Sequence, residues 1–274
     1  MNILEQFKTE AKSQSFVRKY LFKHGRAKCP CCKRERRFRT LGDGRYWCRQ
    51  CRRKWSLKQL AGVRGSKLSF RQIATILYCF FNNHTLQAAM DMAGVSYPTA
   101  RRYYDLMRYK ADAFISLHSK QKLSGQVATD GCYVGKRRNN NQALVLGAVQ
   151  IDYANLALRI VPQEEQGYVE KFLEDTVATG SHILHDGHLA YNDLSWCGYT
   201  HETEYHHLNQ FTLTSAIERI WALFKTFLRR RYHHVTKEKL QDYLTEFQFK
   251  FLHKQTHKNP LKFAQFLFTP VPNA

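Results

Sequence analysis

Two short cysteine pairs constrain the fold of this chain more than any other feature. Cys29 and Cys32 are separated by two residues, as are Cys48 and Cys51, and 15 residues lie between the pairs. This spacing lets four thiolates surround one Zn²⁺ tetrahedrally, with Zn–S distances of about 2.3 Å. We therefore predict a small zinc ribbon with one structural Zn²⁺. Cys31 could compete for the metal, and four unrelated reduced cysteines or two disulfides are the alternatives.

Basic and aromatic side chains surround these cysteines. A ribbon of this size is too small for a large core, so the metal would contribute its folding energy and leave the arginines free for phosphate contacts. A zinc clip that only stabilises the fold or contacts another protein is the alternative. The arginines that we expect to bind DNA here are Arg34, Arg36, Arg37, Arg49, Arg52 and Arg53.

Charge is unevenly distributed along the 274 residues. The chain has 43 Lys and Arg against 22 Asp and Glu, a net charge of +21. Residues 1–66 carry +15, 67–125 carry +5 and 214–274 carry +7, whereas 126–213 carry −6. A merely solvated surface would scatter its charges, so this pattern favours a polyanion-binding module attached to a region that collects carboxylates. Nucleic acid is the polyanion that we expect.

The segment after a linker at 62–67 is predicted to be helical. Ser69 can cap a helix over 70–81, a second helix covers 86–93, and Gly94 makes the turn into a third helix. This order fits a helix-turn-helix whose last helix lies in a DNA groove, although three helices packed without DNA would give the same pattern. The basic residues of the third helix are Arg101, Arg102, Arg108 and Lys110.

From residue 126 the pattern becomes that of strands. Strands are predicted over 126–135, 143–152 and 155–163, then a helix over about 164–178 and a strand over 182–186. This order predicts a mixed sheet covered by helices. Asp130 lies inside the first strand and Asp186 at the end of the last. Both precede a glycine, and Asp-Gly is an ordinary turn signal, so two hairpin corners are the alternative.

A long helix over 214–232 supplies a third carboxylate. Its apolar stripe must face the sheet and consists of Ile217, Trp221, Phe224 and Leu228. At about 100° per residue, Glu218 and Lys225 lie two turns apart at the border of this stripe, and Arg229 lies on the same edge. Lys225 and Arg229 could therefore hold DNA phosphate beside the carboxylate of Glu218.

The carboxylates of Asp130, Asp186 and Glu218 can converge on two Mg²⁺ or Mn²⁺ ions, which suits phosphodiester chemistry. The other acids of this region are expected at the surface: Asp152, Glu164, Glu165, Glu170, Glu174 and Asp175. A histidine metal site is disfavoured, because residues three apart on a strand, such as His182 and His185, point to opposite faces. His207 or His234 near the carboxylates could contact substrate.

At these residues the chain resembles the DDE-type insertion-sequence transposases, in the ISXO-like branch with an N-terminal zinc ribbon. The resemblance covers about residues 25–255. It rests on the two cysteine pairs together with Thr129-Asp-Gly-Cys-Tyr-Val-Gly135, His185-Asp-Gly-His-Leu-Ala-Tyr191, Ile217-Glu-Arg-Ile-Trp-Ala-Leu-Phe-Lys225, Tyr232-His-His-Val and Tyr243-Leu-Thr-Glu-Phe-Gln-Phe249. It implies a ribonuclease-H-like catalytic fold with Asp130, Asp186 and Glu218 as the acidic triad and Lys225 as the basic residue seven positions after the glutamate.

Two positions depart from the resembled pattern. Many members have an acidic residue directly after the first aspartate, where this chain has Gly131. Many also have an asparagine three residues before the glutamate, which some are thought to use at the metal site, and this chain has Ser215 there. Glu218 is therefore the better candidate for the third ligand, and the intact triad argues for an active enzyme.

The sequence predicts three domains in an α+β chain. They are a basic N-terminal segment with the zinc ribbon (1–66), a helical helix-turn-helix DNA-binding domain (67–122), and a ribonuclease-H-like catalytic domain, a mixed sheet flanked by helices, with C-terminal helices (123–274). The resemblance implies a transposase that binds the terminal inverted repeats of its insertion sequence, cleaves the 3′ ends and transfers them to target DNA. A catalytically inactive or domesticated DNA-binding regulator and a metal-dependent nuclease are the alternatives.

The expected partners are double-stranded DNA, both terminal repeats and target, and further copies of the chain, since two DNA ends must be held together. No run reaches the roughly 18 apolar residues of a membrane-spanning helix, and no signal peptide is evident. We therefore expect a cytoplasmic, nucleoid-associated protein with reduced thiols and no membrane partner.

Overall fold

The computed structural model describes residues 3–63, 65–118, 121–136, 141–204, 214–232, 235–256 and 258–268. The chain divides into two compact units. The first unit comprises Met1–Lys110 together with Gln255–Ala274, and the second comprises Ala111–Lys254. None of the helices within the described residues is long and apolar enough to cross a membrane.

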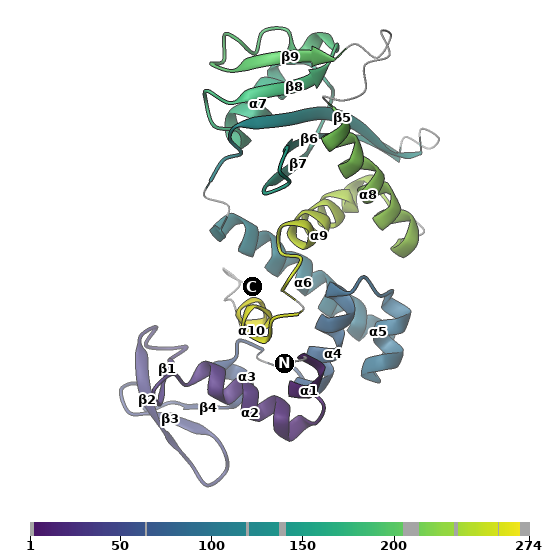
Figure 1. Ribbon diagram of the computed structural model, residues 1–274. Coiled ribbons are helices and arrows are strands. Elements are labelled where there is room, and N and C mark those ends of the chain that lie inside the picture. Colours follow the sequence, from purple (N-terminus) through teal and green to yellow (C-terminus); the bar gives the residue numbers. More distant parts are fainter. Residues whose placement is uncertain are drawn as a thin grey trace. The chain divides into compact units, whose positions relative to one another are not determined.

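The first unit opens with two helices and a small sheet (Figure 1). Helices α1 (Ile3–Gln6) and α2 (Glu10–Leu21) precede four antiparallel strands in the order β1-β2-β3-β4, and the short helix α3 (Leu57–Leu60) follows them. The strands are β1 (Arg26–Lys28), β2 (Glu35–Thr40), β3 (Tyr46–Cys48) and β4 (Lys54–Trp55). This is the predicted ribbon, and within its strands the buried side chains are Ala27, Tyr46 and Cys48. So small a core needs a further source of stability.

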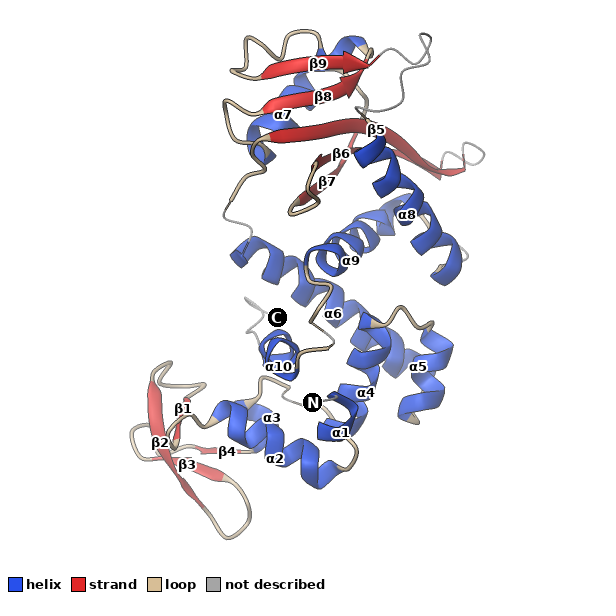
Figure 2. Ribbon diagram, in the orientation of Figure 1, coloured by secondary structure: helices blue, strands red, loops and turns tan. Residues whose placement is uncertain are grey.

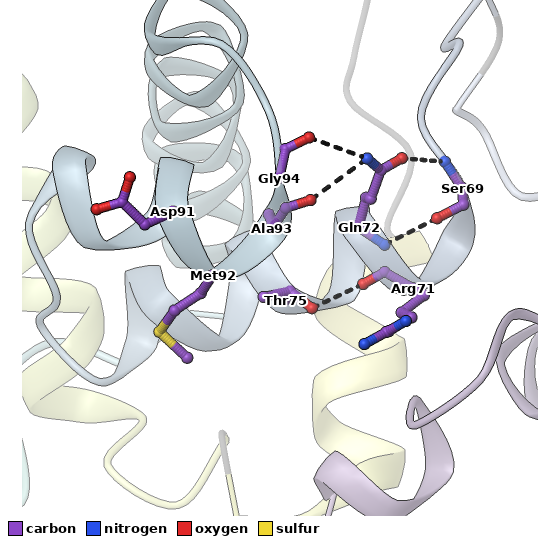
Figure 3. A pocket seen from close by; sticks show the side chains of 8 residues that line it. All are labelled: Ser69, Arg71, Gln72, Thr75, Asp91, Met92, Ala93 and Gly94. Atoms are coloured by element: carbon purple, nitrogen blue, oxygen red, sulfur yellow. Dashed lines mark hydrogen bonds between the residues drawn. The ribbon is translucent and has the colours of Figure 1, made fainter.

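Three helices follow the ribbon at the predicted positions: α4 (Phe70–Phe81), α5 (Leu86–Ala93) and α6 (Tyr97–His118). Ser69 and Gln72 form a capping box at the start of α4, which satisfies two N–H groups that the helix leaves open. The Gln72 amide also donates to the carbonyl oxygens of Ala93 and Gly94, and so ties α4 to the turn before α6 (Figure 3). Gly94 adopts the left-handed conformation there, with φ 61°. Beside this turn lies a shallow pocket of about 420 Å³.

The last helix, α10 (Pro260–Phe268), packs in the first unit. Phe263 and Phe266 are buried, and the ring of Phe81 in α4 lies 6.0 and 5.1 Å from theirs, between centroids. Lys110 donates its ammonium to the carbonyl oxygen of Leu267. The predicted boundaries placed these residues with the catalytic domain, whereas their packing groups them with α4. As a functional division, the three predicted domains stay a prediction.

The second unit is built on a five-stranded mixed sheet in the order β7-β6-β5-β8-β9. The pairs β5–β6 and β6–β7 are antiparallel, whereas β5–β8 and β8–β9 are parallel. The strands are β5 (Gln126–Lys136), β6 (Asn141–Gln150), β7 (Leu156–Val161), β8 (His182–Asp186) and β9 (Thr200–Glu204). Three meandering strands extended on the other side by two parallel ones confirm the predicted mixed sheet.

Helices cover both faces of this sheet (Figure 2). One face packs against α7 (Gln166–Thr176) and the 3₁₀ turn η2 (Leu189–Tyr191), with Phe172 and Tyr191 buried. The other face packs against α8 (Ser215–Arg231) and α9 (Leu240–Leu252), which the 3₁₀ turn η4 (Lys237–Lys239) joins. The predicted apolar stripe of α8 is buried throughout, in the residues Ile217, Trp221, Phe224 and Leu228. The sequence predicted neither β9 nor the start of α7 at residue 166.

Candidate active site

Asp130 and Asp186 lie at matching positions on neighbouring parallel strands. In β5 and β8 the last paired residues are Ala128 and Leu184, and each aspartate comes two residues later. Side chains two apart share a face, and Ala128 and Leu184 both belong to the core under α8. The two aspartates therefore leave the sheet on the α8 side, about one strand spacing (~4.8 Å) apart at the backbone. The structure brings this predicted pair together.

The carboxyl group of Asp130 is half-buried and has one strong donor, the indole Nε1 of Trp221, 2.8 Å from Oδ2. Burial, together with the negative charges of Asp186 and Glu164, raises the pKa of Asp130 to about 6, although hydrogen bonds from Trp221 and from the Gly131 backbone act to lower it. Such a site holds more negative charge than its own partners neutralise. A group of this kind is suited to receive a cation.

Trp221 reaches Asp130 because Gly147 has no side chain. Gly147 lies opposite Asp130 in the β5–β6 ladder. A Cβ atom on Gly147 would come within 2.6 Å of the indole ring, so the ring lies directly on this glycine. The sequence placed Trp221 in the buried stripe of α8 but did not reveal its hydrogen bond. Its position three residues after Glu218, on the same helix face, was the available signal.

Glu218 and Lys225 come from α8, the helix that Trp221 anchors to β5. Glu218 is exposed in the first turn, and its Oε1 accepts a hydrogen bond from Thr214 Oγ1 at 3.4 Å. Thr214 is in turn held by Glu204 Oε2, which accepts from its N–H at 2.6 Å and from its hydroxyl at 2.7 Å. The buried Glu204, at the end of β9, thus fixes where α8 begins. No signal in the sequence pointed to it.

The exposed Lys225 lies next to β5, two turns along α8. Its ammonium is close enough to Cys132 to affect that thiol, which lies two residues after Asp130 on the same face of the strand. Burial raises the pKa of Cys132, and the positive charge of Lys225 lowers it. Arg229, one turn further along, is also exposed. The edge of α8 that carries Glu218 therefore presents two cations beside the strand of Asp130.

Glu164 was expected at the surface, and the structure shows that expectation to be wrong. It follows β7 and lies half-buried against β5, where a Cβ on Gly131 would be only 2.3 Å from its Oε1. The hydroxyl of Tyr191 donates to the same oxygen at 3.2 Å. Burial raises the pKa of Glu164, the charge of Asp186 adds to this, and His188 and Tyr191 lower it. The turn after β7 returns to the middle of the sheet, which the local sequence does not reveal.

The family comparison agrees with this site. The sequence model of the ISXO2-like transposase domain matches residues 122–251, which contain β5 to β9, α7, α8 and nearly all of α9. These residues, just under half of the chain, are similar to an ISXO2-like transposase domain. The resemblance drawn from the motifs is thereby confirmed for this part of the chain.

Two solved structures similar to the chain are viral. One is titled the crystal structure of the catalytic core domain of BIV integrase; its identity is 15%, it covers 45% of this chain and 81% of that one, and the TM-score is 0.34. The other is titled a cryoEM structure of the simian T-cell lymphotropic virus intasome in complex with the PP2A regulatory subunit B56 gamma. Its identity is 14%, with coverage of 73% and 78% and a TM-score of 0.37. No curated protein matches the chain.

The side chains of His182 and His185, both on β8, have partners other than the predicted carboxylates. His185 is buried, stacks on Tyr191, and lies 3.0 Å from His201, between Nε2 and Nδ1. Burial lowers the pKa of His185, so its ring is held neutral. His182 instead meets Thr200 and Glu202. His206, His207, His233 and His234 lie outside the described residues.

The four predicted cysteine ligands gather in the ribbon. The Sγ atoms of Cys29 and Cys51 are 3.8 Å apart, those of Cys32 and Cys48 are 3.9 Å apart, and all four lie within 4.8 Å of one another. A tetrahedral zinc with Zn–S bonds of about 2.3 Å requires S···S separations of about 3.8 Å. The arrangement is compatible with zinc, and the exposed Cys31 lies outside the cluster.

Among the described residues, no other set of three or more Cys, His, Asp or Glu side chains brings its ligand atoms as close together as these four cysteines. The oxygens of the acidic site lie further apart than the thiols. Carboxylates at the ends of separate elements do fit a hard divalent cation, which takes oxygen ligands and completes its shell with water. The donor set therefore suits Mg²⁺ or Mn²⁺.

Most of the arginines predicted to bind DNA are exposed. In the ribbon these are Arg34, Arg37, Arg49, Arg52 and Arg53, and in α6 they are Arg101 and Arg102, whereas Arg36 is half-buried. Two other basic residues of α6 do not fit the predicted basic face. Arg108 is buried and paired with Asp105 at 2.7 Å, and Lys110 is buried against α10. The basic surface of α6 is therefore confined to its first turns.

A buried charge network explains the motifs near the end of the transposase domain. Glu246 of α9 is fully buried and receives Arg231 and Lys250, and the hydroxyl of Tyr232 donates to its Oε2 at 2.8 Å. The rings of Tyr232 and Tyr243 are in contact, tilted by 33° with centroids 4.1 Å apart. These residues join the end of α8 to α9 and lie in the helical layer behind the sheet.

Proposed function

We propose that this chain is a DDE transposase that cleaves the 3′ ends of its insertion sequence and transfers them to target DNA. Asp130, Asp186 and Glu218 are the metal ligands of the proposal, and Lys225 binds phosphate beside them. The single observation that supports it is the pair Asp130 and Asp186 on neighbouring parallel strands, under a helix that carries Glu218 and Lys225, within an ISXO2-like transposase domain.

In this proposal the chain's own residues orient the reacting groups. Trp221 fixes one oxygen of Asp130, and Thr214 holds Glu218 at the start of α8. Lys225 and Arg229 bind the phosphates on either side of the scissile bond. Two Mg²⁺ or Mn²⁺ ions would supply activation of the attacking oxygen and stabilisation of the leaving oxygen. No covalent enzyme intermediate is needed, because water and then the freed 3′-hydroxyl are the nucleophiles.

DNA recognition is assigned to the first unit. The exposed arginines of the ribbon, with one structural zinc in the cysteine cluster, would contact backbone phosphates. Helices α5 and α6 would act as a helix-turn-helix that places Arg101 and Arg102 at the terminal inverted repeats. Two ends must be brought together, so a homodimer or larger assembly on DNA is proposed, acting in the cytoplasm at the nucleoid.

A strand-transfer assay tests this function. The purified chain is incubated in Mn²⁺ or Mg²⁺ with labelled DNA that carries the repeats flanking its gene, together with a target plasmid. We expect end-specific 3′ cleavage and joining. Asp130→Ala and Glu218→Gln should lower both by at least about 10³-fold while leaving DNA binding intact, whereas Asp152→Asn, at an exposed turn, should change neither.

Each alternative function has its own outcome in this assay. Salt-sensitive binding of the ends with no strand breaks in Mn²⁺ would indicate a regulator. Cutting that does not require the ends and never joins them would indicate a nuclease. Undiminished cleavage by Glu218→Gln would remove Glu218 from the ligand set.

A further inference from the structure

Glu164 contacts the middle of the sheet from outside the proposed triad. Both its carboxylate oxygens and its Cδ lie over the Cα of Gly131, since a Cβ built there would be 2.3, 2.6 and 2.5 Å from them. Gly131 follows Asp130 in β5, and its open side faces away from α8. The carboxylate of Glu164 therefore approaches β5 from the face opposite to Asp130.

Two residues of the segment after β8 contact this carboxylate. The hydroxyl of the fully buried Tyr191 donates to Glu164 Oε1 at 3.2 Å. The ring of His188 also lies near this carboxylate. Glu164 thus connects three separate segments, the turn after β7, strand β5 and the turn from His188 to Tyr191.

The turn that Glu164 holds also orients Asp186. The backbone N–H of His188 donates to Asp186 Oδ1 at 3.2 Å, and the N–H of Ala190 donates to the His188 ring at 3.3 Å. The side chain of Asp186 is therefore set by the position of residue 188. That position depends in turn on Tyr191, whose ring packs on His185 while its hydroxyl meets Glu164.

We propose that Glu164 is a positioning residue for Asp186, and that position 131 is a glycine because a side chain there would displace the Glu164 carboxylate. The proposal deepens the proposed function and rests on it for the role of Asp186. Glu164 acts through the turn 188–191, from the opposite face of β5, and does not itself ligate the metal. A partner that orients a metal ligand in this way is commonly worth 10- to 100-fold in metal affinity.

The contact between Gly131 and Glu164 allows a test with a result that a general loss of stability would not produce. Gly131 is not in the left-handed region, so alanine can adopt its backbone conformation. The new methyl group would meet only the end of a flexible side chain, which can move aside. Gly131→Ala should therefore expel the Glu164 carboxylate while β5 keeps its place, and it should do no harm once that carboxylate has been removed.

The experiment is a double-mutant cycle on the full chain, read by isothermal titration with Mn²⁺ in the absence of DNA. We expect Gly131→Ala and Glu164→Ala each to weaken Mn²⁺ binding about 10- to 100-fold. The double variant should bind no more weakly than Glu164→Ala alone, because its methyl group meets no carboxylate. The control is Glu165→Ala, at the exposed neighbouring residue, which should bind Mn²⁺ like the wild type.

Unchanged Mn²⁺ binding by Glu164→Ala, or additive losses in the double variant, would overturn the proposal. Glu164→Gln and Tyr191→Phe serve as gentler variants if the alanine variant fails to fold, since each removes one part of the contact at nearly constant volume. The proposed function fails separately. A wild type that shows the Mn²⁺ coupling but joins no DNA ends would keep Glu164 in its role and remove the transposase reaction.

Discussion

The cysteine cluster and the acidic site both gather metal-type ligands, but they draw them from very different lengths of chain. The four thiols come from 23 consecutive residues, Cys29 to Cys51, and already lie within 4.8 Å of one another. The acidic residues come from β5, the end of β8 and the start of α8, spread from Asp130 to Glu218, and their oxygens lie further apart. One site is local and closed, and the other is assembled by the sheet and open.

This difference implies different sources of order. The ribbon has few buried apolar residues, so the metal itself would hold its two cysteine pairs together. The acidic residues are held by protein: Trp221 on Asp130, Thr214 on Glu218, and Glu164 with Tyr191 behind Asp186. Under the proposed function, metal would therefore be part of the fold in the first unit and would be available for chemistry in the second.

The largest expected effect is the loss of one cysteine. Cys48→Ser should release the zinc and unfold the ribbon, because apparent zinc-binding energies of about 10–16 kcal/mol are folding energy in such modules. We expect one zinc equivalent per wild-type chain and less than about 0.2 per variant chain, with new protease-sensitive sites confined to residues 22–56. Zinc analysis and limited proteolysis measure both quantities.

Cys31→Ser is the matched control, because this cysteine is exposed and lies outside the cluster. It should keep its zinc and its protease resistance. The conclusion that only the ribbon depends on zinc for its fold would be wrong if Cys31→Ser lost zinc, or if removal of zinc also unfolded the second unit.

Removing the charge of a carboxylate should have different effects on the unfolding free energy at two positions of the second unit. Glu246 is fully buried among Arg231, Lys250 and Tyr232, so Glu246→Gln leaves buried cations unpaired and should cost about 3–5 kcal/mol of unfolding free energy. Asp130 lies beside two acidic neighbours, and burial raises its pKa, so Asp130→Asn should cost no stability in the metal-free protein, yet abolish strand transfer. Urea unfolding in EDTA distinguishes the two. Equal destabilisation would mean that Asp130 serves the fold.

The first unit also buries the charged side chain of Lys110, and the pH dependence of the unfolding free energy should reveal what this burial costs. Burial lowers the pKa of Lys110 to about 8, against about 10.4 in an unfolded chain. Below pH 8 the ammonium is buried at full cost. Between pH 8 and about 10.4 the unfolded state binds more protons, so stability should rise with pH by up to about 3 kcal/mol. Lys110→Met lacks this rise, and parallel pH curves for the two proteins would refute the prediction.

The sequence predicted what depends on local spacing. Some features are set by residues close together in the sequence, and the structure has them where expected. They are the two cysteine pairs, the helix caps at Ser69 and Gly94, and the apolar stripe of α8. The order of strands and helices also predicted the mixed sheet. That Asp130 and Asp186 could converge was predicted from their places on two strands, and the motif resemblance supported it, but the register of two strands 56 residues apart cannot be derived from either strand alone.

The features that the sequence did not predict depend on contacts between segments far apart in the chain. Glu164 looks like a surface residue in a polar turn, and only the path from β7 to α7 brings it onto Gly131. Lys110 and Arg108 look like part of a basic helix face, but α10 and Asp105 make them internal. Glu204 looks like a charged strand end, yet it holds the start of α8. Apart from Arg108, whose partner Asp105 lies one turn away in α6, a contact with a distant segment overrides the local pattern in each case.

The smallest expected effect tests how tightly protein alone holds the acidic site. Gly147→Ala would place a methyl group within 2.6 Å of the Trp221 ring, so the indole must move and its bond to Asp130 must lengthen or break. Overpacking of this kind costs about 1–3 kcal/mol. In the Trp221→Phe background the smaller ring leaves room, so the same substitution should cost under about 0.5 kcal/mol. Urea unfolding of the four proteins measures this coupling. Equal costs in both backgrounds would show that the indole does not rest on Gly147, and that Asp130 is free to move until metal arrives.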